Sequence, residues 1–429
     1  MKKLISAILF LVLCNLLIAQ TDFSFEDYGK IGDSSRSHIG IWFETNFNSN
    51  VLNNSVYYNS VFQTGVTRKS MSNMESRVGN KNIAGTQETE RLYYSWLSGS
   101  SNDSSKLIHT VNVSTRRSVN TRFGKDAFLL AGFGNKRFAG EQARVDNLML
   151  NLMQFTQIQY GFMNQKKGEI SYGAGLAFIM GNRYGQYFLN NSHLYTSEIG
   201  DSVFAYANGY LLQSDTSATD IYDISGYGAS VDAFVSIPVD LIKNHDGQGS
   251  IKIELNELGF ISWNSRSVRY NIDGYVDWAG IKAPSIFDVG DSIYKEQVPS
   301  NVQDEFVSSS ERKSFTSALS PRIAIYYTEK LNDNIELRNM LDYRFNANYL
   351  PYIGCTQIFR LTKTAKDYKW FLNVHESLGG YGYLGLGMGI QVEHNKFGAV
   401  LGTRNLMAMA VPEILSGFNV YLGFKWNFK

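Results

Sequence analysis

The sequence of 429 residues predicts an all-β protein, a transmembrane antiparallel β-barrel of the outer membrane with about fourteen strands, in a range of about twelve to sixteen. Three observations predict this fold class. The N-terminus resembles a secretory signal, many later segments alternate apolar and polar residues, and no later run approaches the roughly 18 apolar residues of a membrane helix. A chain that crosses a membrane by strands must close its sheet, because unpaired backbone groups are not tolerated in hydrocarbon.

The first twenty residues have the features of a cleaved secretory signal. Two lysines begin the segment, residues 4–18 are almost entirely apolar, and Ala19 offers a small residue at the cleavage point. This predicts removal of residues 1–20 and a single barrel domain over residues 21–429. A lipoprotein anchored through Cys14 is the alternative, which the large residue before that cysteine disfavours.

Residues 417–428 show the alternation most clearly. Six apolar residues occupy the even positions, namely Phe418, Val420, Leu422, Phe424, Trp426 and Phe428. The odd positions are mostly polar or small. Because successive side chains of a strand point to opposite faces, this segment has one apolar and one polar face, as the closing strand of a membrane barrel requires.

Similar alternation predicts strands along the rest of the chain. In the first third these are residues 38–47, 56–66, 107–115 and 127–133, with residues 70–87 as a polar loop, and later 147–161, 170–180, 225–237, 335–345, 368–374 and 384–392. Short polar segments near residues 164–168, 332–334, 363–367 and 393–396 are predicted periplasmic turns. By the same counting, the long segments near residues 181–224 and 264–320 are predicted outward-facing loops.

The charge and the reactive residues exclude several function classes. With 40 basic and 39 acidic residues, the chain has no basic field for nucleic acid. Beyond residue 20 only Cys355 remains, so neither an internal disulfide nor a cysteine metal cluster is expected. The six histidines are scattered, and we predict no cofactor and no metal.

The inward-facing positions of the predicted strands supply candidate lumen residues. They are Met149, Met153, Phe155, Gly173, Gly175, Gly385, Gly387, Gly389 and His375. The glycine rows leave room for a passage or an inward loop, or they mark bends and close approaches of the backbone. The methionines and the phenylalanine line a conduit for a hydrophobic solute, or they pack in a filled interior. Both alternatives are open at this point.

Aromatic residues near predicted strand ends suggest the girdles that sit at the two membrane interfaces. These candidates are Tyr184, Tyr187, Phe188, Trp263, Trp370, Trp426 and Phe428. A platform for a sugar or a lipid is the alternative function of the same residues.

Three short motifs carry a resemblance to a known group. They lie at residues 194–202 (Leu-Tyr-Thr-Ser before Gly-Asp-Ser), at residues 214–229 (Ser-Asp-Thr-Ser before Gly-Tyr-Gly-Ala) and at residues 256–263 (Asn-Glu-Leu-Gly-Phe-Ile-Ser-Trp). The chain resembles a family of uncharacterised outer-membrane barrels from Bacteroidota, within the wider FadL-like and PorV-like group. In the last motif Glu257 stands where the family pattern has aspartate. The resemblance implies a fourteen-stranded barrel and no particular chemistry.

The expected function is a passive channel or transporter for a small solute, including a hydrophobic one, in the outer membrane of a Gram-negative cell. The alternative is a scaffold or accessory component of protein secretion or surface attachment. Expected partners are therefore outer-membrane lipid and either that solute or a secretion or surface protein. An embedded enzyme would need a base such as His375 beside a serine or a carboxylate, and no Gly-x-Ser-x-Gly elbow occurs. We therefore do not predict an enzyme.

Overall fold

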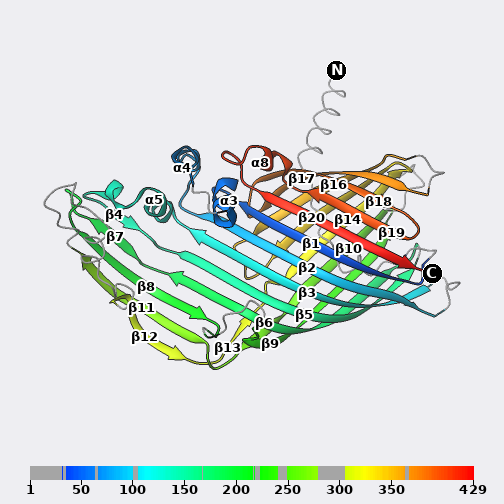
Figure 1. Cartoon of the computed structure of the whole chain (residues 1–429), viewed down its shortest axis with the longest axis horizontal. Helices are drawn as coiled ribbons and strands as arrows, with labels where there is room; N and C mark the ends of the chain where they lie inside the picture. Colours follow the sequence, from blue (N-terminus) through cyan, green and yellow to red (C-terminus); the bar gives the residue numbers. More distant parts are fainter. Residues whose placement is uncertain are drawn as a thin grey trace, which may run out of the picture.

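The computed structural model describes residues 31, 35–62, 66–99, 105–166, 168–215, 217, 223–239, 249–278, 305–362 and 367–429. Antiparallel pairing closes a ring of strands in which the first and last strands meet (Figure 1). Around the ring these are β1 (Ser37–Ser49), β2 (Asn82–Ser98), β3 (Ser105–Phe123), β5 (Leu148–Lys166), β6 (Ser171–Leu189), β9 (Gly226–Val239), β10 (Gly249–Trp263), β14 (Arg322–Asn332), β15 (Ile335–Arg344), β16 (Leu350–Arg360), β17 (Lys369–Gly380), β18 (Leu384–Glu393), β19 (Phe397–Thr403) and β20 (Phe418–Phe428). The predicted fourteen-stranded barrel is thus confirmed.

The barrel wall has the apolar outer face that contact with lipid requires. On β20, Leu422, Phe424 and Trp426 are exposed on the outside, whereas Asn419 and Tyr421 are buried on the inside. The same alternation of exposed apolar and buried polar residues recurs around the ring, and closure pairs the backbone groups that hydrocarbon could not solvate. None of the described helices combines the length and the apolar composition of a membrane-crossing helix.

The two ends of the barrel differ. At the end where β20 finishes, short turns connect β5 to β6, β14 to β15, and β18 to β19. Short turns mark the periplasmic end of bacterial barrels, and we assign this end accordingly. The opposite end carries all the described helices and additional strands that continue the sheet beyond the ring (Figure 1).

This extension is an outer sheet built on the far ends of β5 and β6, which have 19 residues each. The end of β6 pairs with β8 (Val203–Gln213), β8 pairs with β11 (Val268–Trp278), and β11 pairs with β12 (Val307–Arg312). The short strands β4 (Gln142–Arg144) and β7 (His193–Thr196) join its edge, and β13 (Phe315–Ala318) pairs with the end of β10. Segments predicted as long loops therefore hold folded strands.

The predicted strands at residues 56–66 and 127–133 are wrong, and the predicted loop at 70–87 is wrong in part. The structure has α3 (Asn54–Phe62), α4 (Arg68–Glu75), α5 (Lys125–Phe133), η1 (Asn135–Phe138) and α8 (Leu406–Ala410) instead, and β2 begins inside the predicted loop. The reason lies in tertiary packing. Val51, Met74 and Phe128 are buried together in a compact apolar cluster at the outward end of the barrel. Short apolar runs such as these do not by themselves distinguish a helix from a strand.

Candidate functional site

The inner wall of β10 is interrupted by a bulge that begins the candidate site. The register with β9 shifts between Leu255 and Leu258, so that Asn256 and Glu257 lie opposite the single residue Asp232. Glu257 has a φ of 58°, a left-handed conformation that glycine or asparagine adopts more readily. Its backbone N–H donates to Oδ1 of Asp232 at 2.7 Å, which stabilises the distortion. The bulge directs the Glu257 side chain into the lumen.

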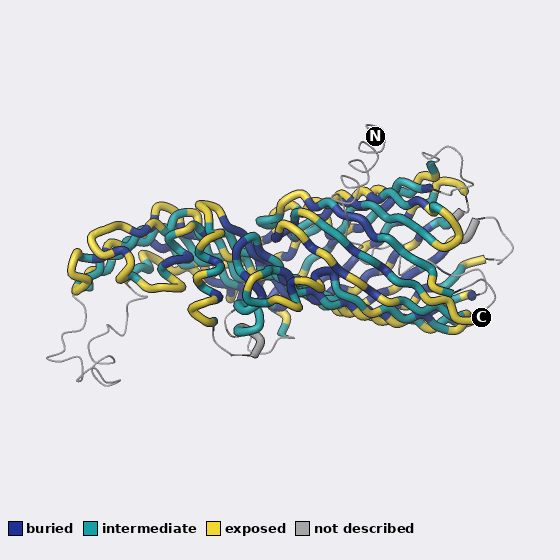
Figure 2. The backbone as a smooth tube through the Cα atoms, turned by 90° about the horizontal axis from the view of Figure 1, so that it is seen from above, coloured by how far each residue is buried: buried dark blue, intermediate teal, exposed yellow. Residues whose placement is uncertain are grey.

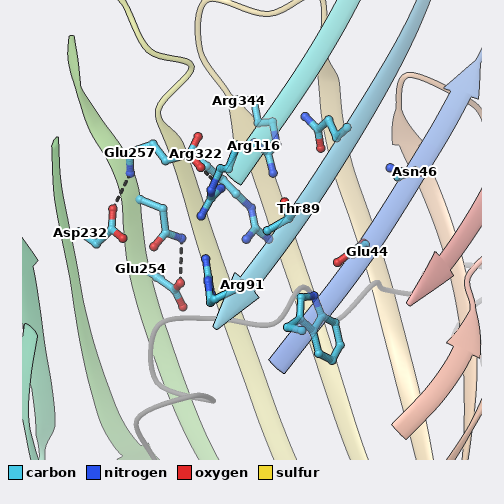
Figure 3. Close-up of a pocket in the computed structure, with 13 residues that line it drawn as sticks. Glu44, Asn46, Thr89, Arg91, Arg116, Asp232, Glu254, Glu257, Arg322 and Arg344 are labelled. Carbon is cyan, nitrogen blue, oxygen red and sulfur yellow. Dashed lines mark hydrogen bonds and ion pairs between the residues drawn. The ribbon is translucent and has the colours of Figure 1, made fainter. Parts of the chain in front are cut away.

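Across the lumen, the Arg116 guanidinium forms an ion pair with the Glu257 carboxylate (Figure 3). Arg116 belongs to β3, and three strands of the ring, β5, β6 and β9, separate β3 from β10. The pair therefore joins walls of the barrel that are not neighbours. Both side chains are largely buried, with 19% and 7% of their surfaces exposed.

Further charged groups surround this pair and form a layer at mid-height, which we call the charge layer. Arg322 Nε lies 2.7 Å from Asp342 Oδ1, and Lys252 Nζ lies 3.2 Å from Glu254 Oε2. The layer consists of Arg91, Arg116, Asp232, Lys252, Glu254, Glu257, Arg322, Asp342 and Arg344. Removing one member of a buried ion pair is costly, because it leaves the other charge without compensation. The layer is therefore sensitive to the loss of any single charge.

The free space of the lumen changes abruptly at this layer. Within it the cavity measures about 60 Å³, enough for a few water molecules, and its lining includes Arg91, Asp232 and Arg344 (Figure 3). On the periplasmic side lies a chamber of about 670 Å³ with a mixed aromatic and polar lining. Trp42 lines both spaces, so the chamber ends directly at the charge layer.

A family model described as a family of unknown function, DUF5723, matches residues 31–403. The chain belongs to the DUF5723 family. The motif at residues 256–263, which carried the resemblance noted above, coincides with the bulge and with the start of the charge layer. In this DUF5723 barrel, Glu257 reaches across the lumen to Arg116.

No curated protein matches the sequence. Among solved structures, the chain is similar to the toluene transporter TbuX of Ralstonia pickettii, with 7% identity, 94% of this chain and 92% of that chain covered, and a TM-score of 0.43. It is also similar to the toluene transporter TodX of P. putida, with 8% identity, 94% of this chain and 92% of that chain covered, and a TM-score of 0.43. A further similar structure is the translocator domain of the autotransporter NalP of Neisseria meningitidis, with 8% identity, 94% and 91% of the two chains covered, and a TM-score of 0.37.

The predicted glycines lie on the inner face of the barrel and are buried. A Cβ atom on Gly387 would collide with backbone atoms of Thr403 and Arg404, and one on Gly389 would collide with the Tyr421 hydroxyl. A Cβ on Gly385 would lie 2.5 Å from Ser377 Oγ, and one on Gly173 would lie 2.6 Å from the Phe234 ring. Gly175 shares the inner face with Gly173. Neighbouring backbone and side-chain atoms thus occupy the space that a Cβ would need at these glycines. This favours close approach of the chain over an open passage.

We expect Gly387→Ala to destabilise the barrel by about 3 kcal/mol, at the upper end of overpacking costs, because the colliding atoms are backbone atoms that cannot rotate away. Gly124→Ala is the matched control, since its added Cβ would meet nothing closer than 3.7 Å and its φ is −84°. Equilibrium urea unfolding in lipid vesicles measures both. An equal effect of the two substitutions would contradict the prediction.

Met153 and Phe155 also face inward, but their side chains do not line an open conduit. Both pack with Ile179, Ile261, Trp263 and Leu319 in a buried apolar cluster on the outward side of the lumen. Met149 is half-buried, with its sulfur 3.6 Å from Asn348 Nδ2. The structure thus favours the filled-interior alternative for these residues.

Two predicted interface aromatics are wrong. Trp263 is 1% exposed and its Nε1 donates to Ser317 Oγ at 2.9 Å, while the buried Tyr184 ring packs 5.5 Å from that of Trp263. The cause is the pair of bulges in β6 and β10, since each added residue inverts the alternation and turns the following side chains inward. Tyr187 and Phe188 lie in the outer sheet, half-buried.

The other aromatic candidates are on the outer surface. Trp370, Trp426 and Phe428 are each more than 40% exposed, and they lie at the periplasmic end of their strands. Phe397 stacks on Trp426 at 6.4 Å between ring centroids. This arrangement suits an interfacial girdle, where aromatic rings meet lipid on one side and water on the other.

His375 points inward between two hydroxyl groups. Its Nδ1 lies 2.9 Å from Thr356 Oγ1 and its Nε2 lies 2.7 Å from Tyr421 Oη. Both ring nitrogens therefore form hydrogen bonds with side chains of other wall strands. Within the described ranges, no group of three or more histidine, cysteine, aspartate and glutamate side chains is placed to hold a metal ion.

The charged residues of the layer were not among the predicted site residues. The signal was present, because Lys252 and Glu254 occupy alternate positions of one strand, as Asp342 and Arg344 do of another. Charges at the inward positions of a strand indicate a lumen feature. That they meet at one height follows only from the ring.

Proposed function

We propose that this protein is an outer-membrane channel for a small solute, and that the charge layer is its closed gate. The observation that carries the proposal is the chamber of about 670 Å³ that ends at the layer. Its volume lies within the range of small-molecule sites. The wall is closed and apolar outside, so passage through the lumen is the transport route that the architecture supports.

The chemistry of the lumen favours a solute with polar edges. Trp42 and Tyr421 offer ring surfaces in the chamber, and Arg338 and Asn373 offer hydrogen-bonding groups beside them. A wholly apolar solute would meet the charge layer without compensating hydrogen bonds, which is unfavourable. An amphipathic solute finds partners at each level. We therefore propose a small amphipathic solute, and a small hydrophobic solute is the alternative.

Solute flux into proteoliposomes tests the proposal. Wild-type protein is compared with the double substitution Arg116→Ala and Glu257→Ala, which removes both charges of the cross-lumen pair together. We expect little maltose or arabinose flux through the wild type and clear flux through the variant. Flux of toluene, the solute named for TbuX and TodX, is measured in the same vesicles to test the hydrophobic alternative. Absence of any flux through folded variant barrels would reject a channel.

A surface scaffold is the second candidate function. The observation in its favour is the outer sheet, which extends the strands well beyond the barrel and offers a broad platform outside the membrane (Figure 2). Isolation of the protein from solubilised outer membranes tests this candidate. A stoichiometric partner that is lost when β8 and β11 are shortened, together with absent flux, would favour the scaffold over the channel.

A further inference from the structure

One face of the outer sheet carries a row of aromatic rings, which we call the ring track. It consists of Phe188, His193, Phe204, Tyr206, Tyr210 and Tyr275, from β6, β7, β8 and β11. Pairing places Phe188 opposite Tyr210, His193 opposite Tyr206, and Tyr206 opposite Tyr275, so these side chains share a face. The rings form two groups on this face: the Phe188 and Tyr210 centroids lie 5.7 Å apart, and neighbouring centroids among His193, Phe204, Tyr206 and Tyr275 lie 5.5 to 6.2 Å apart.

The ring track is continuous with the inner wall of the barrel. Along β6, Tyr184 and Phe188 are four residues apart and therefore point to the same side. Tyr184 packs against Trp263 and Phe315 at the outward end of the lumen. The face that bears the rings thus leads from the outer tip of the sheet to the barrel mouth.

The outer part of the track is exposed. Tyr275 is 65% exposed and Phe204 is 37% exposed, and Tyr195, opposite Phe204 on β7, is 41% exposed. Exposed rings in a row are unusual on a surface that contacts only water, and such patches often mark binding sites. The face therefore has the character of a docking surface.

Polar groups are interleaved with the rings. The Tyr206 hydroxyl donates to Asp273 Oδ1 at 2.8 Å, and this hydrogen bond raises the pKa of Tyr206. Asn271 Nδ2 donates to Ser309 Oγ at 2.9 Å, and the Arg269 guanidinium lies 5.1 Å above the Tyr210 ring. The alternation of flat apolar surfaces with hydrogen-bonding groups is repeated along the sheet.

This combination selects the chemistry of the occupant. A pyranose ring has C–H faces that stack on the negative face of an aromatic ring, and hydroxyl edges that match carboxylate and amide groups. A hydrocarbon would displace water from the exposed carboxylates of Asp273 and Asp277, which is unfavourable, and an anionic polymer would meet the same two carboxylates, which outnumber Arg269 on this face. A neutral oligosaccharide meets both sets of groups favourably.

We propose that the ring track is a binding site for a neutral oligosaccharide, held by stacking on Phe204 and Tyr275 and by hydrogen bonds to Asp273 and its neighbours. The track ends where β6 enters the barrel wall, next to the buried Tyr184. The site goes beyond the proposed channel, because binding to the outer face does not require the charge layer to open.

The test is calorimetric titration of full-length protein in lipid nanodiscs with maltohexaose and cellohexaose, with hexagalacturonate as the anionic probe and toluene as the apolar probe. We expect at least one neutral hexasaccharide to bind. Tyr275→Ala should weaken that binding about tenfold, and Phe204→Ala with Tyr275→Ala about a hundredfold, since each lost stacking surface is worth on the order of one factor of ten.

Tyr383→Ala is the matched control. Tyr383 is a 60% exposed tyrosine between β17 and β18, away from the outer sheet, and its removal should leave binding unchanged. Heat-modifiable gel migration verifies that each variant is folded, and Tyr275→Phe, which keeps the ring, should bind like the wild type. No binding of either neutral hexasaccharide, tighter binding of hexagalacturonate or toluene, or equal loss with Tyr383→Ala would overturn the proposal. Because binding is measured on the closed wild-type barrel, failure here would leave the flux results for the channel unaffected.

Discussion

Glu257→Gln is expected to raise ion conductance across a planar lipid bilayer about tenfold or more relative to the wild type. Glutamine keeps the size of the side chain but removes the negative charge that faces Arg116 across the lumen. Breaking one partner of a buried ion pair costs about 3–5 kcal/mol, and each factor of ten in an open population requires only about 1.4 kcal/mol. The closed arrangement of the charge layer should therefore lose its advantage over an open one.

Glu88→Gln is the matched control for this measurement. Glu88 pairs with Arg117, the residue that follows Arg116, at 3.1 Å, but this pair lies on the outer face of the wall and is about one-third exposed. Loss of this pair should leave conductance unchanged, because the pair lies outside the lumen and does not obstruct it. Equal conductance of wild type and Glu257→Gln, in barrels shown to be folded, would mean that the charge layer is not the barrier.

Trp263→Ala should destabilise the barrel by about 4 kcal/mol, the range for removing a fully buried large aromatic. The Trp263 side chain is 1% exposed, packs in the cluster with Met153 and Phe155, and donates to Ser317, whose hydroxyl would lose this donor. Because β10 and β13 are joined through this contact, the outward end of the lumen should loosen first. Urea unfolding in vesicles gives the free energy, and hydrogen exchange gives the location.

The comparison for Trp263 is another tryptophan of the same barrel. Trp426 is 42% exposed on the lipid-facing side of β20, and Trp426→Ala should cost clearly less because it leaves no internal cavity. If the two substitutions had the same effect, Trp263 would be no more important to the fold than a girdle residue.

Much of the barrel was predictable because its strands are long and regularly patterned. β20 and β18 alternate apolar and small or polar residues without interruption, and their inward and outward faces were predicted correctly. The helices α3 and α5 were not predicted, because a short apolar run has no period long enough to distinguish a helix from a strand. Their conformation is decided by a cluster that gathers Met74, Phe123 and Phe128 from separate segments.

The candidate site was predictable only in part. The inward positions of Gly387 and Met153 followed from alternation, but what fills the space in front of them did not. Tyr184 and Trp263 were misplaced because a β-bulge inverts the alternation, and no residue type in these segments announces one. Arg116 and Glu257 lie 141 positions apart, 257 less 116, and nothing in the sequence pairs them.

The sequence by itself determined that the chain forms strands with one apolar face, because a period of two residues is a local property that each segment carries alone. Only the tertiary structure decided which side chains meet inside, how the outer sheet continues the lumen, and where the barrel is shut. Those outcomes depend on ring closure, on the register between distant strands and on two bulges. They arise from the packing of the whole chain and are encoded in no single segment.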